Sequence, residues 1–100
     1  MQTDVLASAV RTTDGVMNDQ TGNAIGRCRV KGIYIVPAAG AGSVAFKDGL
    51  TAGAANKITV NTITGSTSTN WLLMPGEGLL FQNGIFADLT DVASVMVVYG

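Results

Sequence analysis

Among the side chains that could do chemistry in this chain of 100 residues are seven carboxylates and one thiol, and histidine is absent. Without histidine the commonest general base and metal ligand is missing, so neither a Ser-His-Asp nor a Cys-His arrangement can be built. A pair of carboxylates could in principle hydrolyse a glycoside, but most of them stand beside turns. They are Asp4, Asp14, Asp19, Asp48, Glu77, Asp88 and Asp91. We therefore predict no catalytic residue and no enzymatic activity.

Three of these acids, Asp14, Asp19 and Asp48, lie in turn sequences, where an aspartate usually bonds its own backbone. No Asp-x-Asp-x-Asp-Gly spacing occurs, so we expect turn residues rather than calcium ligands. Glu77 stands between two glycines and has the best claim among the acids to a special role, although its simplest interpretation is an exposed turn residue. No metal and no other cofactor is predicted.

Charge and cysteine content restrict the partners further. The net charge of −1 and the pI near 4.9 provide no field that would steer the molecule onto nucleic acid or an anionic membrane, so direct binding to either is not expected. Cys28 has no second cysteine to pair with, and we interpret it as a buried thiol, which favours assembly in a reducing cytoplasm. Neither a membrane span nor a signal peptide is indicated.

The composition is that of one small domain with few charges. Charged residues make up 13% of the chain, against about 25% in an average globular protein. Because Gly, Ala, Ser, Thr and Asn take their place, much of the surface must be uncharged, as on a protein that packs against neighbours. A small neutral surface without any partner is the alternative.

The elements that must position these residues are strands. No window of helical period extends beyond about two turns, and β-branched residues dominate the apolar positions. We predict an all-β fold: a single antiparallel β-sandwich or barrel, jelly-roll-like, with eight or nine short strands over residues 1–100. Residues 1–24 are a possible N-terminal arm or hairpin, and Asn83-Gly84 predicts a type I′ hairpin. The expected strands are 4–12, 15–18, 25–36, 43–47, 57–63, 70–74, 78–82, 85–89 and 93–99.

The last strand is apolar on both faces, which is unusual for a strand with water on one side. With a period of two, one face carries Val92, Ser94, Met96 and Val98, and the other carries Ala93, Val95, Val97 and Tyr99. Neither set is charged, so a second sheet is expected on one side and another subunit on the other. Candidate interface residues are Val95, Val97 and Tyr99.

The expected strand 25–36 changes character halfway. Arg27, Arg29 and Lys31 share a face that continues as Ile33 and Ile35. The opposite face would turn Cys28, Val30, Tyr34 and Val36 toward the core. Under the functional interpretation, the two isoleucines lie in a subunit contact and the three cations face an acidic neighbour, such as Asp88 or Asp91 of another copy. Under the alternative, the sheet curls so that a loop of the same chain covers the isoleucines, and the cations are solvated.

The aromatic residues are expected mainly inside. Trp71 with Leu73, and Phe81 with Leu79, are predicted to form core. The alternative for Trp71 is a platform on which a sugar ring stacks.

Several segments together resemble small virion structural proteins of tailed bacteriophages, especially those of marine and cyanobacterial hosts. The similarity covers roughly 27–100, and its most distinctive parts are Lys47-Asp48-Gly49 and Pro75-Gly76-Glu77-Gly78 in that order. The segments that carry it are 33–36, 41–49, 74–81 and 93–100. The first 24 residues match only loosely.

The resemblance implies a particle component made in the host bacterial cytoplasm and assembled on the virion. The implied function is that of a capsid decoration, or cement, protein: a homo-oligomer, expected to be a trimer, that contacts the major capsid protein or other virion proteins and stabilises the head shell. Arg27, Arg29 and Lys31 would then contact the capsid or a neighbour. The alternative is a tail, neck or fibre-associated virion protein with a glycan- or receptor-binding role.

Overall fold

The structure is a computed structural model, and it describes residues 6–38, 40, 42–62, 70–74, 76 and 78–100. Asp4, Pro75 and Glu77 lie outside the described residues. The chain is all-β, as predicted, and strands lie within or beside each range expected from the sequence. The strands are β1 (Leu6–Ala7), β2 (Gly15–Val16), β3 (Cys28–Pro37), β4 (Ser43–Asp48), β5 (Ala55–Asn61), β6 (Asn70–Leu73), β7 (Leu79–Phe81), β8 (Ile85–Thr90) and β9 (Val92–Tyr99).

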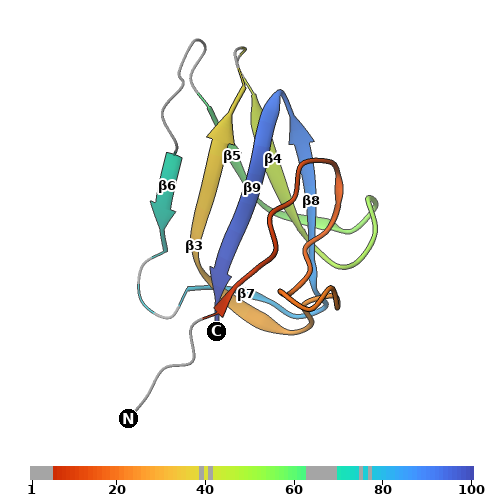
Figure 1. The fold of residues 1–100 in the computed structure, drawn as a ribbon. Coiled ribbons are helices and arrows are strands. Elements are labelled where there is room, and N and C mark those ends of the chain that lie inside the picture. Colours follow the sequence, from red (N-terminus) through yellow and green to blue (C-terminus); the bar gives the residue numbers. More distant parts are fainter. Residues whose placement is uncertain (1–5, 39, 41, 63–69, 75, 77) are drawn as a thin grey trace.

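The strands form two antiparallel sheets that pack face to face (Figure 1). Sheet A has the order β1-β9-β3-β6, with β7 also paired to β3, and sheet B has the order β2-β8-β4-β5. The pairs are nested along the chain: β1 with β9, β2 with β8, β3 with β6, and β4 with β5. This nesting is the jelly-roll arrangement, with β7 added to it.

The core lies between the two sheets. Its largest fully buried side chains are Phe46 of sheet B, Phe81 and Ile33 of sheet A, and Met17, which follows β2. Each side chain of this size contributes about 1.5–3 kcal/mol when it is removed from water, so this layer is the main source of stability.

Two β-bulges decide which residues face this core. Between β3 and β9, Val30 pairs with Tyr99 and Gly32 pairs with Val98, so Lys31 is an extra residue in β3. Farther along, Val36 pairs with Ser94 and Pro37 with Val92, so Ala93 is an extra residue in β9. Because one inserted residue exchanges the two faces of a strand, the inward positions change from even to odd numbers at both places.

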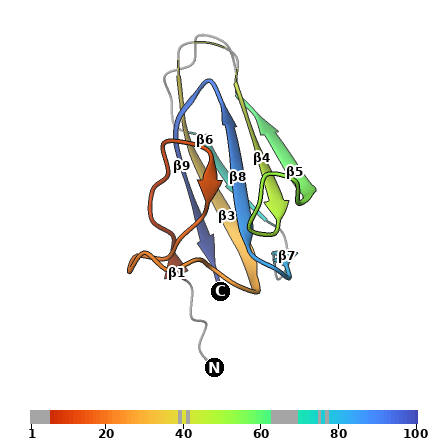
Figure 2. The same cartoon turned by 90° about the vertical axis from the view of Figure 1, so that its right-hand side faces the viewer.

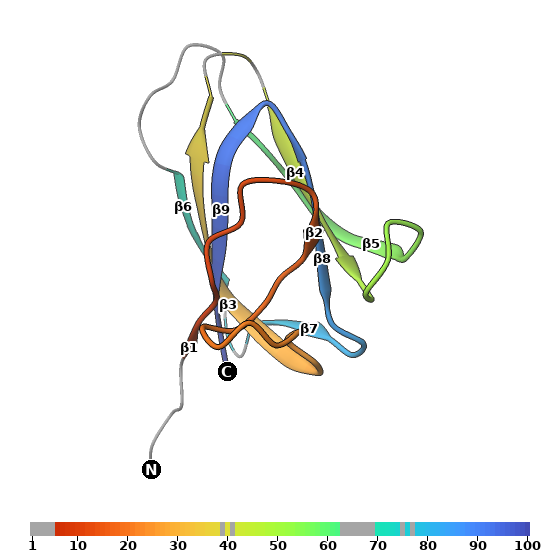
Figure 3. The ribbon, with the colours of Figure 1, turned by 45° about the vertical axis from the view of Figure 1, so that its right-hand side comes forward.

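The segment 8–25 closes one side of the sandwich (Figures 2 and 3). The Ser8 amide donates to the Val97 carbonyl in sheet A, and the Met17 amide donates to the Ile85 carbonyl in sheet B, both over 2.8 Å. The buried Ser8 hydroxyl also accepts a hydrogen bond of 2.9 Å from the Val97 amide. Within the described part of 1–24, β1 and β2 belong to different sheets, and Asn18 and Ala24 form an isolated antiparallel bridge.

The predicted Asn83-Gly84 hairpin is wrong. β7 pairs with β3 in sheet A and β8 pairs with β4 and β2 in sheet B, so the chain crosses between the sheets at this turn. Gly84 has a φ of +123°, but Asn83 does not lie in the left-handed region that a type I′ turn requires of both residues. Instead, the Asn83 amide donates a hydrogen bond of 2.8 Å to Oδ1 of Asp48.

Candidate interaction surface

The outer face of sheet A is an apolar surface. On each strand its residues alternate with those that face the core, and we call this set the apolar face. It consists of Gly32, Tyr34 and Val36 of β3, Trp71 and Leu73 of β6, and Ser94, Met96 and Val98 of β9. Trp71 is 48% exposed, Leu73 is 65% exposed and Tyr34 is 41% exposed, and none of the eight residues is charged.

Two aromatic rings of the apolar face contact each other. Trp71 pairs with Tyr34 across β6 and β3, and the ring centroids are 5.4 Å apart at an interplanar angle of 72°. The Trp71 indole also extends over Gly32, where a Cβ atom would come within 2.9 Å of its Cη2 atom. Because Gly32 has no side chain, the indole lies close to the sheet, and its position is fixed on two sides.

This arrangement corrects the expectation that Trp71 and Leu73 form core. Tyr34 was also expected inside, and it lies outside because the bulge at Lys31 exchanges the faces of β3. Phe81 is buried, as expected, and Leu79 packs against the core.

The proposed interface residues Ile33, Ile35, Val95, Val97 and Tyr99 lie on the opposite face of sheet A. All five are between 0% and 8% exposed and belong to the core of the single chain. A side chain buried within one subunit has no surface left for another, so these positions are corrected from interface to core. The physical reason is the same bulge in β3, together with the pairing of Val95, Val97 and Tyr99 opposite its inward residues.

The three cations lie toward the opposite end of β3 from Pro37. Arg27 is exposed just before the strand, while Arg29 and Lys31 are half-buried within it. Arg29 is held by two backbone hydrogen bonds of 3.0 Å with Gly100, and the Lys31 carbonyl accepts one of 3.0 Å from the Met74 amide. The structure thus places the cations beside the apolar face, at one end of it.

An acidic residue marks the other end. Asp91 is the single residue between β8 and β9, where the chain crosses from sheet B to sheet A. It is exposed and has a φ of +50°, a conformation that aspartate adopts more readily than most residues. Charges of opposite sign therefore lie beyond the two ends of the apolar face.

Three other aspartates are engaged with backbone amides. Oδ1 of Asp19 accepts from the amides of Thr21 and Asn23, as expected of a turn residue, and its pKa is lowered chiefly by the Thr21 hydroxyl. Asp14 and Asp48 accept instead from distant residues, Leu89 and Asn83, so they join elements rather than cap their own turns. In the described part of the chain, no cluster of three or more acidic, Cys or His side chains could hold a metal ion.

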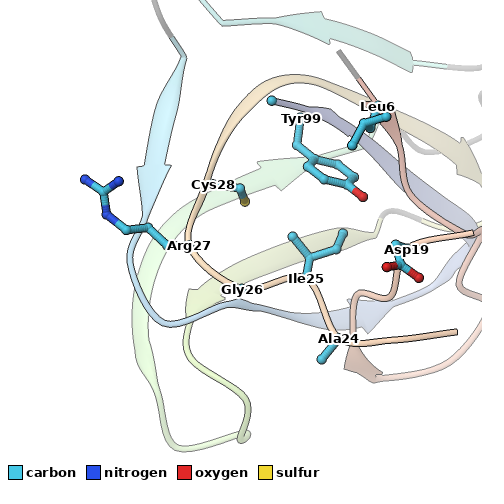
Figure 4. A pocket seen from close by; sticks show the side chains of 9 residues that line it. Leu6, Asp19, Ala24, Ile25, Gly26, Arg27, Cys28 and Tyr99 are labelled. Carbon is cyan, nitrogen blue, oxygen red and sulfur yellow. The ribbon is translucent and has the colours of Figure 1, made fainter. Parts of the chain in front are cut away.

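A pocket of about 340 Å³ opens at the end of the sandwich where β1 meets β9 (Figure 4). The Tyr99 ring stands between Cys28 and Asp19, and the Arg27 side chain points away from the other residues. The lining residues are Leu6, Asp19, Ala24, Ile25, Gly26, Arg27, Cys28, Tyr99 and Gly100.

The pocket offers no activated nucleophile. Burial raises the pKa of the Cys28 thiol to about 11, so it is protonated near neutral pH. Burial also raises the pKa of the Tyr99 hydroxyl, and the Asp19 carboxylate is already bonded to its turn. These groups give the pocket no evident chemistry, and the apolar face is the stronger candidate for function.

The outer face of sheet B has a different character. The residues of β4, β5 and β8 that alternate with the inward ones point outward, and most of them are polar. They are Ser43, Ala45, Lys47, Thr59, Asn61, Phe86, Asp88 and Thr90. Nζ of Lys47 lies 3.5 Å from Oδ2 of Asp88 and donates to the Ala52 carbonyl over 2.7 Å. This face is suited to water.

No protein-family model, curated protein or solved structure matches this chain. None of the described residues belongs to a helix with the length and hydropathy needed to cross a membrane.

Proposed function

We propose that this chain is a non-enzymatic assembly protein whose apolar face is covered by another protein subunit. The observation that carries the proposal is the exposure of Trp71, Leu73 and Tyr34 together on an uncharged sheet face. Soluble monomers rarely expose contiguous apolar patches larger than a few hundred Å², and the aromatic residues found here are enriched in protein interfaces. The absence of histidine from the sequence agrees with a role that needs no general base.

The specific form that we propose is a decoration protein of a tailed bacteriophage head, bound to the major capsid protein or another virion protein. The segments that resemble phage virion proteins support it, among them Lys47-Asp48-Gly49. The jelly-roll topology recurs in viral capsid domains, which supports the proposal by analogy of fold alone. The protein would be made in the bacterial cytoplasm and reside on the virion, with no direct contact to DNA or membrane.

Such a protein acts by burying surface on its neighbours. Each contact adds to the free energy needed to open the shell, and repetition around the particle provides avidity even when a single contact is weak. In this proposal, the cations at one end of β3 contact an acidic surface of the neighbour, because charge complementarity orients the encounter.

The direct test is to add the purified protein to phage heads that lack it and to measure co-sedimentation and the temperature at which the heads release DNA. We expect bound protein and a higher release temperature. The variant Leu73→Asp should reduce both effects, while Leu50→Asp, the same change at an exposed leucine outside the apolar face, should leave them unchanged. Heads that neither bind the protein nor gain heat resistance would contradict the proposal.

A glycan- or receptor-binding role is the second candidate, and the exposed Trp71 and Tyr34 rings favour it. Exposed aromatic faces can stack on sugar rings, and jelly rolls also occur in lectins. Binding on a glycan array that is lost in Trp71→Ala and kept in Trp71→Phe, with both variants folded, would favour this function over assembly.

A further inference from the structure

We propose that a second copy of this chain covers the apolar face, so that two sheets A stack about a two-fold axis with their strands running in opposite directions. The inference rests on the proposed function, because it names the subunit that lies on the face. It is argued from the composition of the two outer faces, from the area available, and from the charges at the two ends of β3.

The composition of the surfaces favours self-packing. A ring with head-to-tail contacts requires two different complementary surfaces on each subunit, whereas a two-fold contact uses one surface twice. Sheet B cannot supply the second apolar surface, because Lys47, Asp88 and several hydroxyl and amide side chains occupy its outer face. Among the described sheet faces, the surface that best matches the apolar face is therefore the apolar face of another copy.

The area of the face fits a weakly associating pair. Sheet A presents four rows of chain, because residues 6–11 continue along β9 through the Ser8 and Arg11 hydrogen bonds. These rows hold 28 residues in all, and at about 4.8 Å between rows and about 3.3 Å per residue they cover about 440 Å². Two copies then bury about 900 Å², slightly below the limit of about 1,000 Å² for a specific stable interface, which fits weak association. Face-to-face sheets also pack readily at about 10 Å separation.

The charges set the direction of stacking. Tyr34 is three residues from Lys31 and three from Pro37, and Pro37 pairs with Val92, the residue after Asp91. A two-fold axis at the level of Tyr34 therefore brings the Lys31 end of one copy to the Asp91 end of the other, twice per dimer. Parallel stacking would instead place the basic ends together, which is unfavourable.

The anchors of this contact are Trp71 and Leu73. The Trp71 ring is already fixed over Gly32 and against Tyr34, so little side-chain freedom is lost when the second copy binds. Tryptophan residues that an interface covers fully are typical hot spots.

Sedimentation equilibrium of the purified chain tests the dimer. We expect the mass to rise from 10.2 kDa to twice that value across about 1–100 µM. Leu73→Asp should weaken association by about 100-fold, because it introduces a charge into the contact once from each copy. Leu50→Asp is the matched control and should associate like the wild type. A chain that stays monomeric, a trimer, or a dimer unaffected by Leu73→Asp would overturn the proposal.

A double-mutant cycle tests the direction of stacking. Lys31→Gln and Asp91→Asn should each weaken the dimer about two- to fivefold, and the double variant should weaken it no more than either single change. Asparagine is chosen at position 91 because it tolerates the positive φ. Additive effects of the two changes would overturn the antiparallel arrangement.

The test of the dimer uses the isolated chain and the test of function uses phage heads, so their failures can be told apart. A dimer that does not bind heads would leave the inference standing and remove the proposed capsid role. A monomer that binds heads through Leu73 would keep the proposed function and assign the apolar face to the capsid.

Discussion

The two outer faces of this sandwich have the same strand geometry but expose different kinds of side chain. Sheet B exposes hydroxyl and amide groups and an ion pair between Lys47 and Asp88, whereas sheet A exposes Tyr34, Trp71 and Leu73. The low charge of the chain does not explain this difference, because it applies to the whole sequence. The exposed apolar side chains are concentrated on one face, which is the pattern expected for the covered surface that we propose.

The largest expected effect is a contrast between two adjacent residues of β9, one of which faces the core and the other the apolar face. Val97 is fully buried and Met96 is half-buried on the apolar face. Val97→Asp should prevent folding, since a charge without a partner in the core costs more than about 4 kcal/mol. Met96→Asp should fold and lose association. Circular dichroism and sedimentation of both variants check this, and an unfolded Met96→Asp protein would remove the distinction between the two surfaces.

The next largest effect on stability is expected at Gly32, over which the Trp71 ring lies. Gly32→Val should displace the indole and lower the free energy of unfolding by about 1–3 kcal/mol, because a Cβ at 2.9 Å from Cη2 cannot be accommodated without movement. A red shift of tryptophan emission should accompany the loss. Gly53→Ala, at a position where an added Cβ meets no atom within 4 Å, serves as the control and should change stability by less than about 0.5 kcal/mol. An unchanged emission spectrum in Gly32→Val would contradict the described packing.

A smaller effect is expected at the ion pair of sheet B. Lys47→Gln and Asp88→Asn should each lower stability by at most about 1 kcal/mol, because the Asp88 side chain is 41% exposed and an ion pair with a solvated partner contributes little. Neither change should affect association, in contrast to Leu73→Asp. Chemical denaturation together with sedimentation measures both quantities, and loss of association in either variant would place sheet B in the interface.

The smallest expected effect is a loss of stability in acid, and it should affect the Asp48 contact of sheet B before it affects sheet A. The pKa of Asp48 is lowered chiefly by the hydrogen bond from the Asn83 amide, so this carboxylate stabilises the fold above about pH 4, and the stabilisation is lost as the pH falls through its lowered value. The strands of sheet A contain no carboxylate. As the pH is lowered to 3, the rate of amide hydrogen exchange should therefore increase at Asn83 before it increases in β3 and β9. Asp48→Asn should remove this pH dependence, and an equal rise in both regions would contradict it.

The sequence was sufficient to predict the strands but not their faces. Turn residues and β-branched runs marked each strand, and the fold class followed from their number and spacing. The faces of β3 and β9 were assigned by strict alternation, which fails where Lys31 and Ala93 are inserted. The change along β3 from cations to isoleucines at odd positions was the visible sign of the first bulge. The adjacent Gly32 agrees with a bulge at that position.

The candidate surface was predictable only in part. Two-sided apolarity of the last strand indicated that its outer side would be uncharged, and the structure places Met96 and Val98 there. Trp71 could not be assigned from β6 alone, since a four-residue strand at a sheet edge carries too little pattern to show which side faces the core. The position of its ring depends on Gly32, which is distant in sequence and becomes its neighbour only through the pairing of β3 and β6.

The pairing of β1 with β9 also has a consequence for biosynthesis. These strands lie at opposite ends of the described chain, and the Ser8 bonds to Val97 span 89 positions. Sheet A therefore cannot be completed until the last strand has left the ribosome, and contacts of such long sequence separation form slowly. The surface made by β9, β3 and β6 forms only after β9 has been synthesised, so a nascent chain that ends before β9 does not present it.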